Sequence, residues 1–460
     1  MSPRLVDTAR RLVPLAWPVF IGQVAVLAFS TVDTLMIARY AALDLAALAV
    51  GAAAYITIFI GLMGVVLAVA PIAGQLYGAQ RFREAGEELQ QAVWLALGAS
   101  AFGCTLLLWP EPFLQLAHAS PQVAAKARGH LTALAFALPP ALVFTAYRGF
   151  NVAVSRPKAV MALQLGALLL KVPLNALFIH GFTLPGGFVF EAMGTPGCGT
   201  ATAVVMWCQA LAAWWVIRRD PFYARFELQG RPFSPPRRAG LVALLRLGAP
   251  MGMALLIEVT GFTSMAFFIS RIGATPVAGH QIAANLVSLL FMMPLALANA
   301  TGTVVAQRIG AGDPLDAQRV GVHGLQIGLL LAAVVGGCIY LTREAVVRLY
   351  THDAVIIAAA LPLLSWVVLF HIGDAAQTLA SFILRAYRIA AVPVLIYAVS
   401  LWGVGLGGGY VIAFNVTGST PPGLLGARGF WFASTVSLAI AGLALGSFLA
   451  WVWRQKRSER

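Results

Sequence analysis

The feature that most constrains the fold of this chain is a series of long apolar stretches that recurs from one end to the other. A membrane-spanning helix needs about 20 consecutive, mostly apolar residues. The sequence predicts twelve such spans, at 13–38, 45–76, 91–110, 126–148, 159–180, 197–217, 241–270, 277–306, 321–341, 354–384, 391–414 and 429–453. We therefore expect an all-α integral membrane protein, since a helix satisfies its own backbone hydrogen bonds in lipid.

The composition agrees with this class of protein. Of the 460 residues, 60% are hydrophobic and only 10% are charged, whereas a soluble domain has about 25% charged residues. The 45 glycines and 25 prolines are tolerated in membrane helices, where neighbouring helices satisfy the backbone groups that they free. The N-terminal segment runs directly into the first span without a cleavage motif, so we interpret it as a membrane helix and not as a removed signal peptide.

The distribution of basic residues predicts the topology. With the N-terminus in the cytoplasm, the cytoplasmic segments hold roughly three times as many Lys and Arg as the opposite side, which is the positive-inside bias. Both termini are then cytoplasmic, and the expected location is the bacterial cytoplasmic (inner) membrane, with the lipid bilayer as partner. The net charge of +14 is spread over short segments, which argues against nucleic-acid binding.

The two halves of the chain resemble each other. A shift of 232 residues aligns Pro18 with Pro250, Gln75 with Gln307, and Gly78 with Gly310. A charged, proline-rich linker at 218–240 separates the halves, so the predicted lobes are 1–217, with helices 1–6, and 241–460, with helices 7–12. Six spans in each half give a parallel repeat with a pseudo-two-fold axis along the membrane normal, an arrangement typical of alternating-access transporters. Shared membrane composition alone is the alternative explanation of the matches.

Three carboxylates lie deep within predicted spans: Asp33 in the first, Glu258 in the seventh and Asp374 in the tenth. An ionised carboxylate at the bilayer centre costs at least ~2.5–3.5 kcal/mol. A bound proton or cation relieves this cost, so all three are candidates for ion coupling. The alternative is that each is only hydrogen-bonded to a neighbouring helix.

Polar side chains accompany these acids at helical spacing. Gln377 and Thr378 follow Asp374 by one turn, and two other pairs are each four residues apart: Gln281 with Asn285, and Lys171 with Asn175. Their oxygen atoms suit Na⁺, a hard cation, as well as a proton relay. Lys171 could pair with an acid or extend toward the membrane surface, and spacing does not decide between these two arrangements.

Several stretches resemble the multidrug and toxic compound extrusion (MATE) family and, within it, the NorM-type bacterial branch. They include "STVDTLMIARYAALDLAALAVG", "KVPLNALFIHG", "LGAPMGMALLIEVTGF", "VAGHQIAANLVSLLFMMPLALANATG" and "DAAQTLASFILRAYR". The resemblance covers nearly the whole chain and implies twelve helices in two lobes, with export of cationic or amphiphilic drugs against inward Na⁺ or H⁺ flow. It implies that Glu258 and Asp374 form a cation site in the C-lobe, that Asp33 with Asn175 and Thr202 couples ions in the N-lobe, and that Pro18 is a hinge.

The chain departs from the family pattern at two positions. NorM-type members often have a tyrosine one turn before the tenth-span acid, where this chain has Phe370, which weakens the Na⁺ assignment. Proton-coupled relatives often have a second acid four residues after the fifth-span asparagine, where this chain has Ile179. The coupling ion, Na⁺ or H⁺, therefore stays open.

We expect a secondary transporter that needs no cofactor and works as a monomer. The alternative is another two-lobed carrier, such as a flippase for lipid-linked or amphiphilic substrates. The chain lacks the G-x-x-x-D-R-x-G-R-R signature of major facilitators, and Lys171 is the only intramembrane lysine, whereas flippase cavities tend to be strongly basic. A membrane enzyme would need clustered catalytic groups, and the seven histidines are dispersed.

Overall fold

A computed structural model describes residues 3–183, 189–230 and 233–458 of the chain. Residues 231 and 232 of the predicted linker lie outside the described residues. The elements are α1 (Pro3–Tyr40), α2 (Ala42–Val66), α3 (Val69–Gly78), α4 (Phe82–Leu108), α5 (Glu111–Leu116), α6 (Pro121–Ala153), α7 (Pro157–His180), β1 (Phe182–Thr183), β2 (Val189–Phe190), α8 (Thr195–Arg219), η1 (Pro221–Phe226), α9 (Arg238–Ser270), α10 (Ala274–Gly310), α11 (Pro314–Tyr350), α12 (Ala354–Leu364), α13 (Val367–Ala386), α14 (Ala391–Tyr397), η2 (Ala398–Gly408), α15 (Gly409–Ala413), η3 (Pro422–Leu424) and α16 (Ala427–Ser458).

The predicted all-helical membrane architecture is confirmed. The described residues contain 12 helical segments that are long and apolar enough to cross a membrane. Most begin a few residues before the predicted spans, because charged and polar first turns extend the helices beyond the apolar segment. The third, for example, begins at Phe82, whereas the apolar pattern alone placed its start at residue 91.

The second span is divided into α2 and α3 by a turn at Leu67 and Ala68. Pro71 explains the turn, since proline has no backbone N–H to donate to the carbonyl four residues earlier. That carbonyl belongs to Leu67, and it accepts instead from the Ala70 N–H at 3.0 Å. Hydropathy could not show this break, because the residues around it are all apolar.

The predicted tenth span, 354–384, is wrong as a single helix. The structure has two helices there, α12 and α13, separated by a turn at Ser365 and Trp366. The Trp366 N–H bonds to the Leu363 carbonyl, three residues back, so the α-helical hydrogen-bond pattern is interrupted. Only α13 is long enough to count as a membrane span, while α12 is a short apolar helix before it.

The described residues form two compact units. The N-terminal unit is Ile21–Gly252, and the C-terminal unit combines Met253–Arg460 with the described part of Met1–Phe20. The first part of α1 therefore belongs to the C-terminal unit: Leu12 is fully buried in a core that includes Val305 and Leu384. The predicted lobe boundaries, 1–217 and 241–460, stay a prediction.

The first part of α9 belongs to the N-terminal unit in the same way. Two of its glycines lie directly against the α2 backbone. A Cβ atom built on Gly248 would lie 2.2 Å from the Val65 carbonyl oxygen, and one on Gly252 would lie 2.5 Å from that of Gly61. Glycine is required at both positions because only a missing side chain permits so close a backbone approach.

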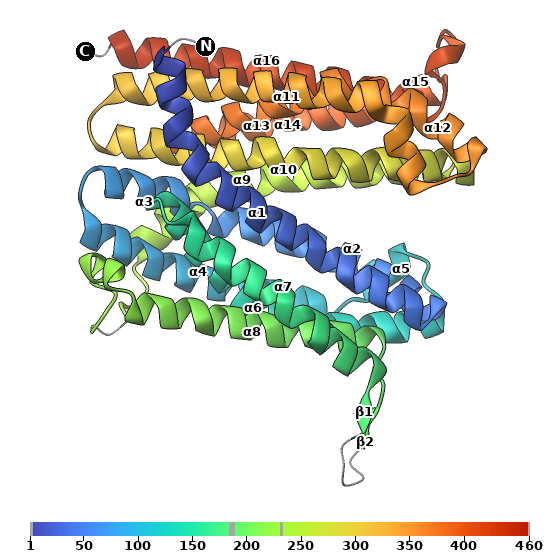
Figure 1. Cartoon of the computed structure of the whole chain (residues 1–460), viewed down its shortest axis with the longest axis horizontal. Helices are drawn as coiled ribbons and strands as arrows, with labels where there is room; N and C mark the ends of the chain where they lie inside the picture. The colour runs from blue at the N-terminus through green and yellow to red at the C-terminus, as the bar shows by residue number, and fades with distance from the viewer. Residues whose placement is uncertain (1–2, 184–188, 231–232, 459–460) are drawn as a thin grey trace. The chain divides into compact units, whose positions relative to one another are not determined.

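In the N-terminal unit, α6 is the central helix. It packs against α2, α4 and α8, and α7 packs against α8. At the end of α7 the chain forms the short antiparallel pair β1 and β2, which extends away from the helices (Figure 1). This unit positions α1, α7 and α8 together, and these three helices carry its predicted site residues.

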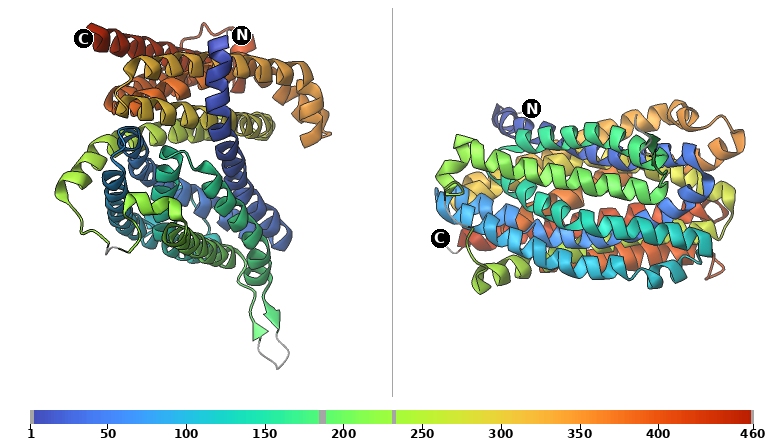
Figure 2. Two further views of the ribbon diagram at one scale, coloured as in Figure 1. Left: turned by 60° about the vertical axis from the view of Figure 1, so that its left-hand side comes forward. Right: turned by 90° about the horizontal axis from the view of Figure 1, so that it is seen from below.

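In the C-terminal unit, α13 takes the central position and packs against α10, α11 and α16. Figure 1 and Figure 2 show α10, α11 and α16 as long helices that run along the unit. The following span changes from α14 into the π-helix η2, a wide-turn geometry that is frequent at functional sites. Trp402 of η2 donates from its indole N–H to the Ile257 carbonyl of α9 at 3.1 Å, directly beside Glu258.

Candidate functional site

Asp33 lies where α1 packs in parallel against α7. Two contacts on either side of it fix the register of the two helices. A Cβ on Gly22 would lie 2.1 Å from the Gln164 side-chain oxygen of α7, and Ile37 lies in one buried cluster with Ile179. The offset between the helices is the same in each pair, and that offset places Asp33 opposite Asn175.

Asp33 has two nitrogen partners on α7. Its Oδ1 atom lies 3.0 Å from the Lys171 ammonium and accepts a hydrogen bond of 2.6 Å from the Asn175 side-chain amide. The Lys171 side chain is fully buried, while that of Asp33 is 17% exposed. The structure thus decides between the two arrangements of Lys171 that the sequence left open: it pairs with an acid.

The third wall of this cluster is α8. Thr202 accepts a hydrogen bond from the Lys171 ammonium and donates its own hydroxyl proton to the Cys198 carbonyl at 3.0 Å. Ile179, where proton-coupled relatives were expected to have an acid, is fully buried among apolar neighbours that include Ile37 and Cys198. Among the described residues, therefore, Asp33 faces a buried lysine and no second carboxylate.

The C-terminal unit brings Glu258 of α9 and Asp374 of α13 to the same side chain. The Gln377 amide nitrogen lies 3.0 Å from Asp374 Oδ1 and 3.5 Å from Glu258 Oε1, and it also lies 3.0 Å from the Thr378 hydroxyl. Asp374 is 5% exposed and Gln377 is 1% exposed. The predicted group Glu258, Asp374, Gln377 and Thr378 is thus assembled in space.

Two members of this cluster were not predicted. The Tyr397 hydroxyl donates to the Gln377 side-chain oxygen, and Arg385 interacts electrostatically with Glu258. The sequence offered no signal for Tyr397, which lies on the following span. Arg385 was assigned to a cytoplasmic segment, although it continues the polar stripe that Asp374, Gln377 and Ser381 form along one face of α13; this spacing could have revealed it.

The C-terminal cluster contains several oxygen atoms that could contact a hard cation. It offers carboxylate oxygens from two residues and the Thr378 hydroxyl, and hard cations prefer oxygen ligands. When both acids are ionised, they outnumber the single buried guanidinium of Arg385. The N-terminal cluster has one carboxylate and one ammonium, so its charges already cancel.

The remaining predicted residues lie elsewhere. Gln281 and Asn285 are exposed on α10, and Asn285 accepts a 3.4 Å hydrogen bond from the Tyr350 hydroxyl. Neither has a hydrogen bond to an acid in the part of the chain that the structure describes. Pro18 is buried within α1, where it leaves the Pro14 carbonyl without its helical partner.

A fourth buried acid, Asp44, serves a structural purpose. It is 2% exposed at the start of α2 and accepts hydrogen bonds from the Thr195 backbone N–H at 2.8 Å and from Lys126 at 3.1 Å. Together they tie the first turn of α2 to α6 and α8. Among the described residues, no three His, Cys, Asp or Glu side chains are grouped so as to hold a metal ion.

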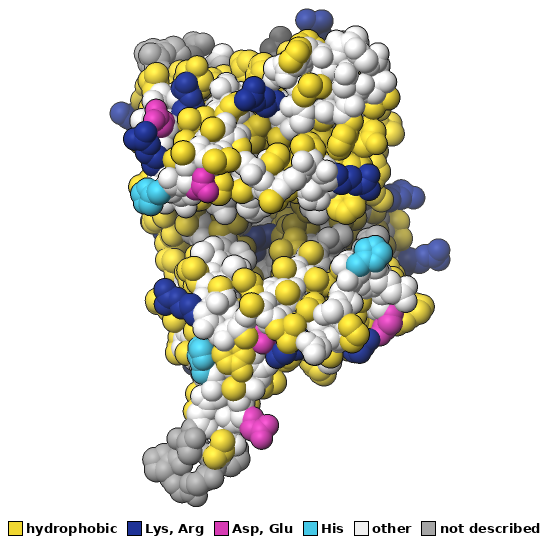
Figure 3. Space-filling view, turned by 90° about the vertical axis from the view of Figure 1, so that its right-hand side faces the viewer, with side chains coloured by type: hydrophobic (Ala, Val, Ile, Leu, Met, Phe, Trp, Pro, Cys, Tyr) yellow, Lys and Arg dark blue, Asp and Glu magenta, His cyan; other side chains and the backbone are white. Residues whose placement is uncertain are grey.

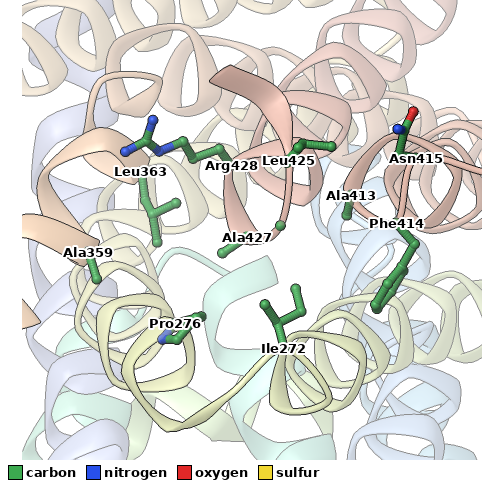
Figure 4. Close-up of a pocket in the computed structure, with 11 residues that line it drawn as sticks. Ile272, Pro276, Ala359, Leu363, Ala413, Phe414, Asn415, Leu425, Ala427 and Arg428 are labelled. Atoms are coloured by element: carbon green, nitrogen blue, oxygen red, sulfur yellow. The ribbon is translucent and has the colours of Figure 1, made fainter. Parts of the chain in front are cut away.

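A cavity of about 600 Å³ lies at one end of the C-terminal unit (Figure 4). Its walls are mainly apolar side chains, such as Ile272, Leu363 and Phe414, with Arg428 at the start of α16. None of the predicted site residues lines it. Figure 3 shows the end of the molecule with the β1–β2 pair, where charged side chains are scattered among apolar ones.

The relatives of the chain agree with this architecture. The MatE family model matches residues 18–177 and 250–411, the two halves of the predicted repeat. "Probable multidrug resistance protein NorM" of Aromatoleum aromaticum (strain DSM 19018 / LMG 30748 / EbN1) is 38% identical over 98% of this chain and 96% of its own length. "Multidrug resistance protein NorM" of Vibrio cholerae serotype O1 (strain ATCC 39315 / El Tor Inaba N16961) is 33% identical over 97% of this chain and 96% of its own.

Solved structures match the fold over nearly all of the chain. The eukaryotic MATE transporter AtDTX14 has a TM-score of 0.87 at 17% identity and covers 99% of this chain and 98% of its own. The Vibrio cholerae MATE transporter VcmN in its bent form has a TM-score of 0.85 at 17% identity, with 98% of each chain covered. The family model and the full-length relatives together show that the chain belongs to the MatE family of membrane transporters.

Proposed function

We propose that this chain is a multidrug efflux antiporter that exports cationic and amphiphilic small molecules in exchange for Na⁺ or H⁺. The observation that carries the proposal is the cluster of Glu258 and Asp374 around Gln377 in the C-terminal unit. The names of the full-length relatives, which are multidrug resistance proteins, support the substrate class.

The mechanism follows from the cost of buried charge. Two carboxylates in the hydrocarbon region are strongly disfavoured when both are ionised, and a proton or Na⁺ relieves that cost. The ion therefore binds more tightly to whichever conformation brings the two acids closest, and its binding shifts the balance between conformations. A cationic drug that relies on the same negative charge is released when the ion arrives.

The remaining parts of the proposal follow from the sequence. The lobes are 1–217 and 241–460, the protein works as a monomer in the bacterial inner membrane, and both termini are cytoplasmic. Asp33 is the coupling acid of the N-terminal unit, supported by Asn175, Thr202 and Lys171. Gln281 and Asn285 are accessory polar residues, and Pro18 is the hinge in α1.

The test is efflux of a cationic dye from proteoliposomes under an imposed Na⁺ gradient and, separately, an imposed pH gradient. We expect Glu258→Gln and Asp374→Asn each to abolish gradient-driven efflux, because neither amide can bind a proton or supply a carboxylate ligand. Glu344→Gln is the matched control, since Glu344 is an exposed glutamate of the same unit that pairs with Arg348. Efflux that persists in both acid variants would exclude a coupling role for this cluster.

A further inference from the structure

The N-terminal unit contains a buried lysine, Lys171. The predicted role of Asp33 in binding a cation does not explain why a lysine is buried beside it. A cation site presents a carboxylate whose negative charge no protein cation already cancels. Asp33 instead lies 3.0 Å from the Lys171 ammonium, and that ammonium is completely shielded from solvent. Because a buried charge needs a partner, the functions of Asp33 and Lys171 depend on each other.

The Lys171 ammonium has two oxygen partners and one aromatic neighbour. It donates to Thr202 and to Asp33, and it lies 5.5 Å from the centre of the Phe29 ring, where a cation is attracted by the aromatic face. An ammonium in this position supplies the charge that a bound Na⁺ or a drug cation would otherwise bring to Asp33. Both nitrogen contacts of Asp33 are to Oδ1, so Lys171 cancels the charge of the carboxylate, and a cation from solution would meet a pair that is already neutral.

Asn175 can hydrogen-bond to Asp33 whether or not the carboxyl group carries a proton. Its side-chain nitrogen donates to Asp33, while its side-chain oxygen is buried and has no hydrogen-bond partner among the described residues. A rotation of the amide would turn that oxygen toward Asp33, where it could accept the proton of a carboxylic acid. Asn175 can therefore hydrogen-bond to Asp33 in either protonation state.

We propose that Lys171 is the tethered counter-ion of Asp33, that is, a cation attached to the chain itself. A proton that binds Asp33 then releases the Lys171 ammonium from the carboxylate, and no bound cation leaves the site. The net charge of the cluster then alternates between zero and +1, and the cluster never carries the net negative charge that would attract Na⁺ or a cationic drug. Binding of such cations is confined to Glu258 and Asp374 in the C-terminal unit. The assignment of cation binding to Glu258 and Asp374 rests on the proposed antiport. The proposed charge states of Asp33 and Lys171 do not depend on it.

The other titratable groups near the pair come from two further helices. His130 on α6 and Cys198 on α8 both interact electrostatically with Asp33 and Lys171. The His130 Nδ1 atom lies 3.0 Å from the Thr195 carbonyl oxygen, which can only accept, so this nitrogen carries the proton. Neither His130 nor Cys198 carries a carboxylate or an ammonium, so Lys171 is left as the counter-ion of Asp33.

The test is equilibrium binding of ²²Na⁺ and of tetraphenylphosphonium to the purified full-length protein. The C-terminal cluster is first silenced with Glu258→Gln and Asp374→Asn, which gives the silenced protein. In this background we expect Asp33→Asn to leave binding of either cation unchanged, because Lys171 already cancels the charge of the carboxylate. Weaker binding after Asp33→Asn would overturn the proposal, and this comparison needs no change at Lys171.

The second arm removes the tether. Lys171→Met in the silenced protein should create a new cation site, with binding roughly tenfold tighter or more, because an ammonium beside the carboxylate is lost. Adding Asp33→Asn should remove the gain, and Lys171→Arg should not produce it. Lys126→Met, which removes a lysine from another aspartate pair of the same unit, should give no Asp33-dependent binding.

Folding and function are controlled separately. Lys171→Gln keeps a polar side chain and replaces Lys171→Met if the methionine variant fails to fold, as judged by size-exclusion chromatography. It should show the same gain in cation binding. A folded Lys171→Gln protein without Asp33-dependent cation binding would refute the tethered counter-ion. If the unmodified protein fails to transport dye under any gradient, the proposed antiport is wrong, while the binding comparisons still decide the role of Lys171.

Discussion

Gln377 determines the geometry of the C-terminal cluster because one amide group serves both acids. Its nitrogen is shared between Asp374 and Glu258, so the orientation of the amide decides how far apart the two carboxylates are held. That orientation is fixed from the other side by the Tyr397 hydroxyl. Tyr397 therefore acts on the acids through Gln377 as a positioning residue.

We expect Tyr397→Phe to lower the rate of gradient-driven efflux by about two- to tenfold, and to cost about 1 kcal/mol of stability, as loss of one buried hydrogen bond does. Efflux from proteoliposomes and thermal unfolding measure the two effects. Tyr340→Phe is the control, since Tyr340 is an exposed tyrosine of the same unit. Equal transport rates in Tyr397→Phe and the unmodified protein would show that Gln377 needs no such support.

At this scale the sequence predicts the acids of each site and several of their polar neighbours, but it missed Arg385 and Tyr397 and did not show which residues pair across helices. Asp33, Glu258 and Asp374 stand out because acids are rare in apolar spans. Lys171 and Tyr397 each meet a residue of a different helix, and one sequence contains no information on which faces of two helices meet. Asn285 is a predicted site residue that the structure does not bring to an acid. Helical spacing suggested a polar pair with Gln281, but both side chains lie on an exposed face of α10.

Among the elements, α9 and α2 approach most closely where glycines replace side chains. The Val65 carbonyl opposite Gly248 belongs to a helix backbone, which cannot move aside as a flexible side chain would. We expect Gly248→Ala to destabilise the protein by about 1–3 kcal/mol, the usual cost of inserting a methyl group into a packed interface. Unfolding by sodium dodecyl sulfate in mixed micelles measures the change.

Gly98→Ala is the matched control for this substitution. Gly98 also lies inside a helix of the N-terminal unit, but a Cβ atom there would meet no other atom within 4 Å. Its stability should be unchanged or slightly higher, because alanine favours the helix. If both alanine variants behave alike, the contact between α9 and α2 is less tight than described.

The start of α2 is held by a single acid. Gly194 precedes α8 with φ of +60°, and this backbone conformation brings the Thr195 N–H to Asp44. We expect Asp44→Asn to lower stability by about 2 kcal/mol or more, because Lys126 loses its charged partner and the amide offers the Thr195 N–H only its oxygen. Thermal unfolding in detergent is the measurement.

Asp353→Asn provides the comparison. Asp353 is an exposed N-cap whose carboxylate accepts from the Val355 N–H at 2.8 Å, and asparagine caps helices about as well as aspartate. Its effect should be near zero. A similarly small effect for Asp44→Asn would mean that the start of α2 is held by apolar packing alone.

For the elements, hydropathy predicts where spans occur but not where they break. Pro71 marks the turn at Leu67, because its missing N–H leaves the Leu67 carbonyl without a helical partner, but Pro18 does the same within α1 without ending the helix. Pro362 does not mark the turn at Ser365 in this way, since its missing N–H affects the carbonyl of Ala358, within α12. Apolar composition therefore overestimated the length of the tenth span.

For the whole molecule, the sequence repeat predicts two similar halves but not how helix segments are shared between the units. The first part of α1 is grouped with the C-terminal unit and the first part of α9 with the N-terminal unit. In the repeat these are equivalent helices, and both carry a proline, Pro18 or Pro250, shortly before the point where the unit changes. Nothing in hydropathy or spacing distinguishes this exchange from two self-contained lobes.

The exchange has a consequence for the stability of the separate halves. If the chain is divided after Gly230, the N-terminal fragment lacks the part of α9 that completes its unit. The C-terminal fragment lacks Leu12, which is fully buried in the core of the C-terminal unit. We expect either fragment alone to be degraded or aggregated in the membrane. Co-expressed fragments should copurify and restore drug efflux to cells.

An N-terminal fragment extended to Gly252 isolates the cause. It regains the glycine-rich part of α9 that packs on α2, so it should accumulate to a higher level and resist detergent unfolding better than the fragment that ends at Gly230. Gly248→Ala in the extended fragment should reverse the improvement, because the added helix can no longer approach Val65. Equal accumulation of the short and extended fragments would mean that each half is self-contained and that the exchanged segments contribute nothing to the cores they join.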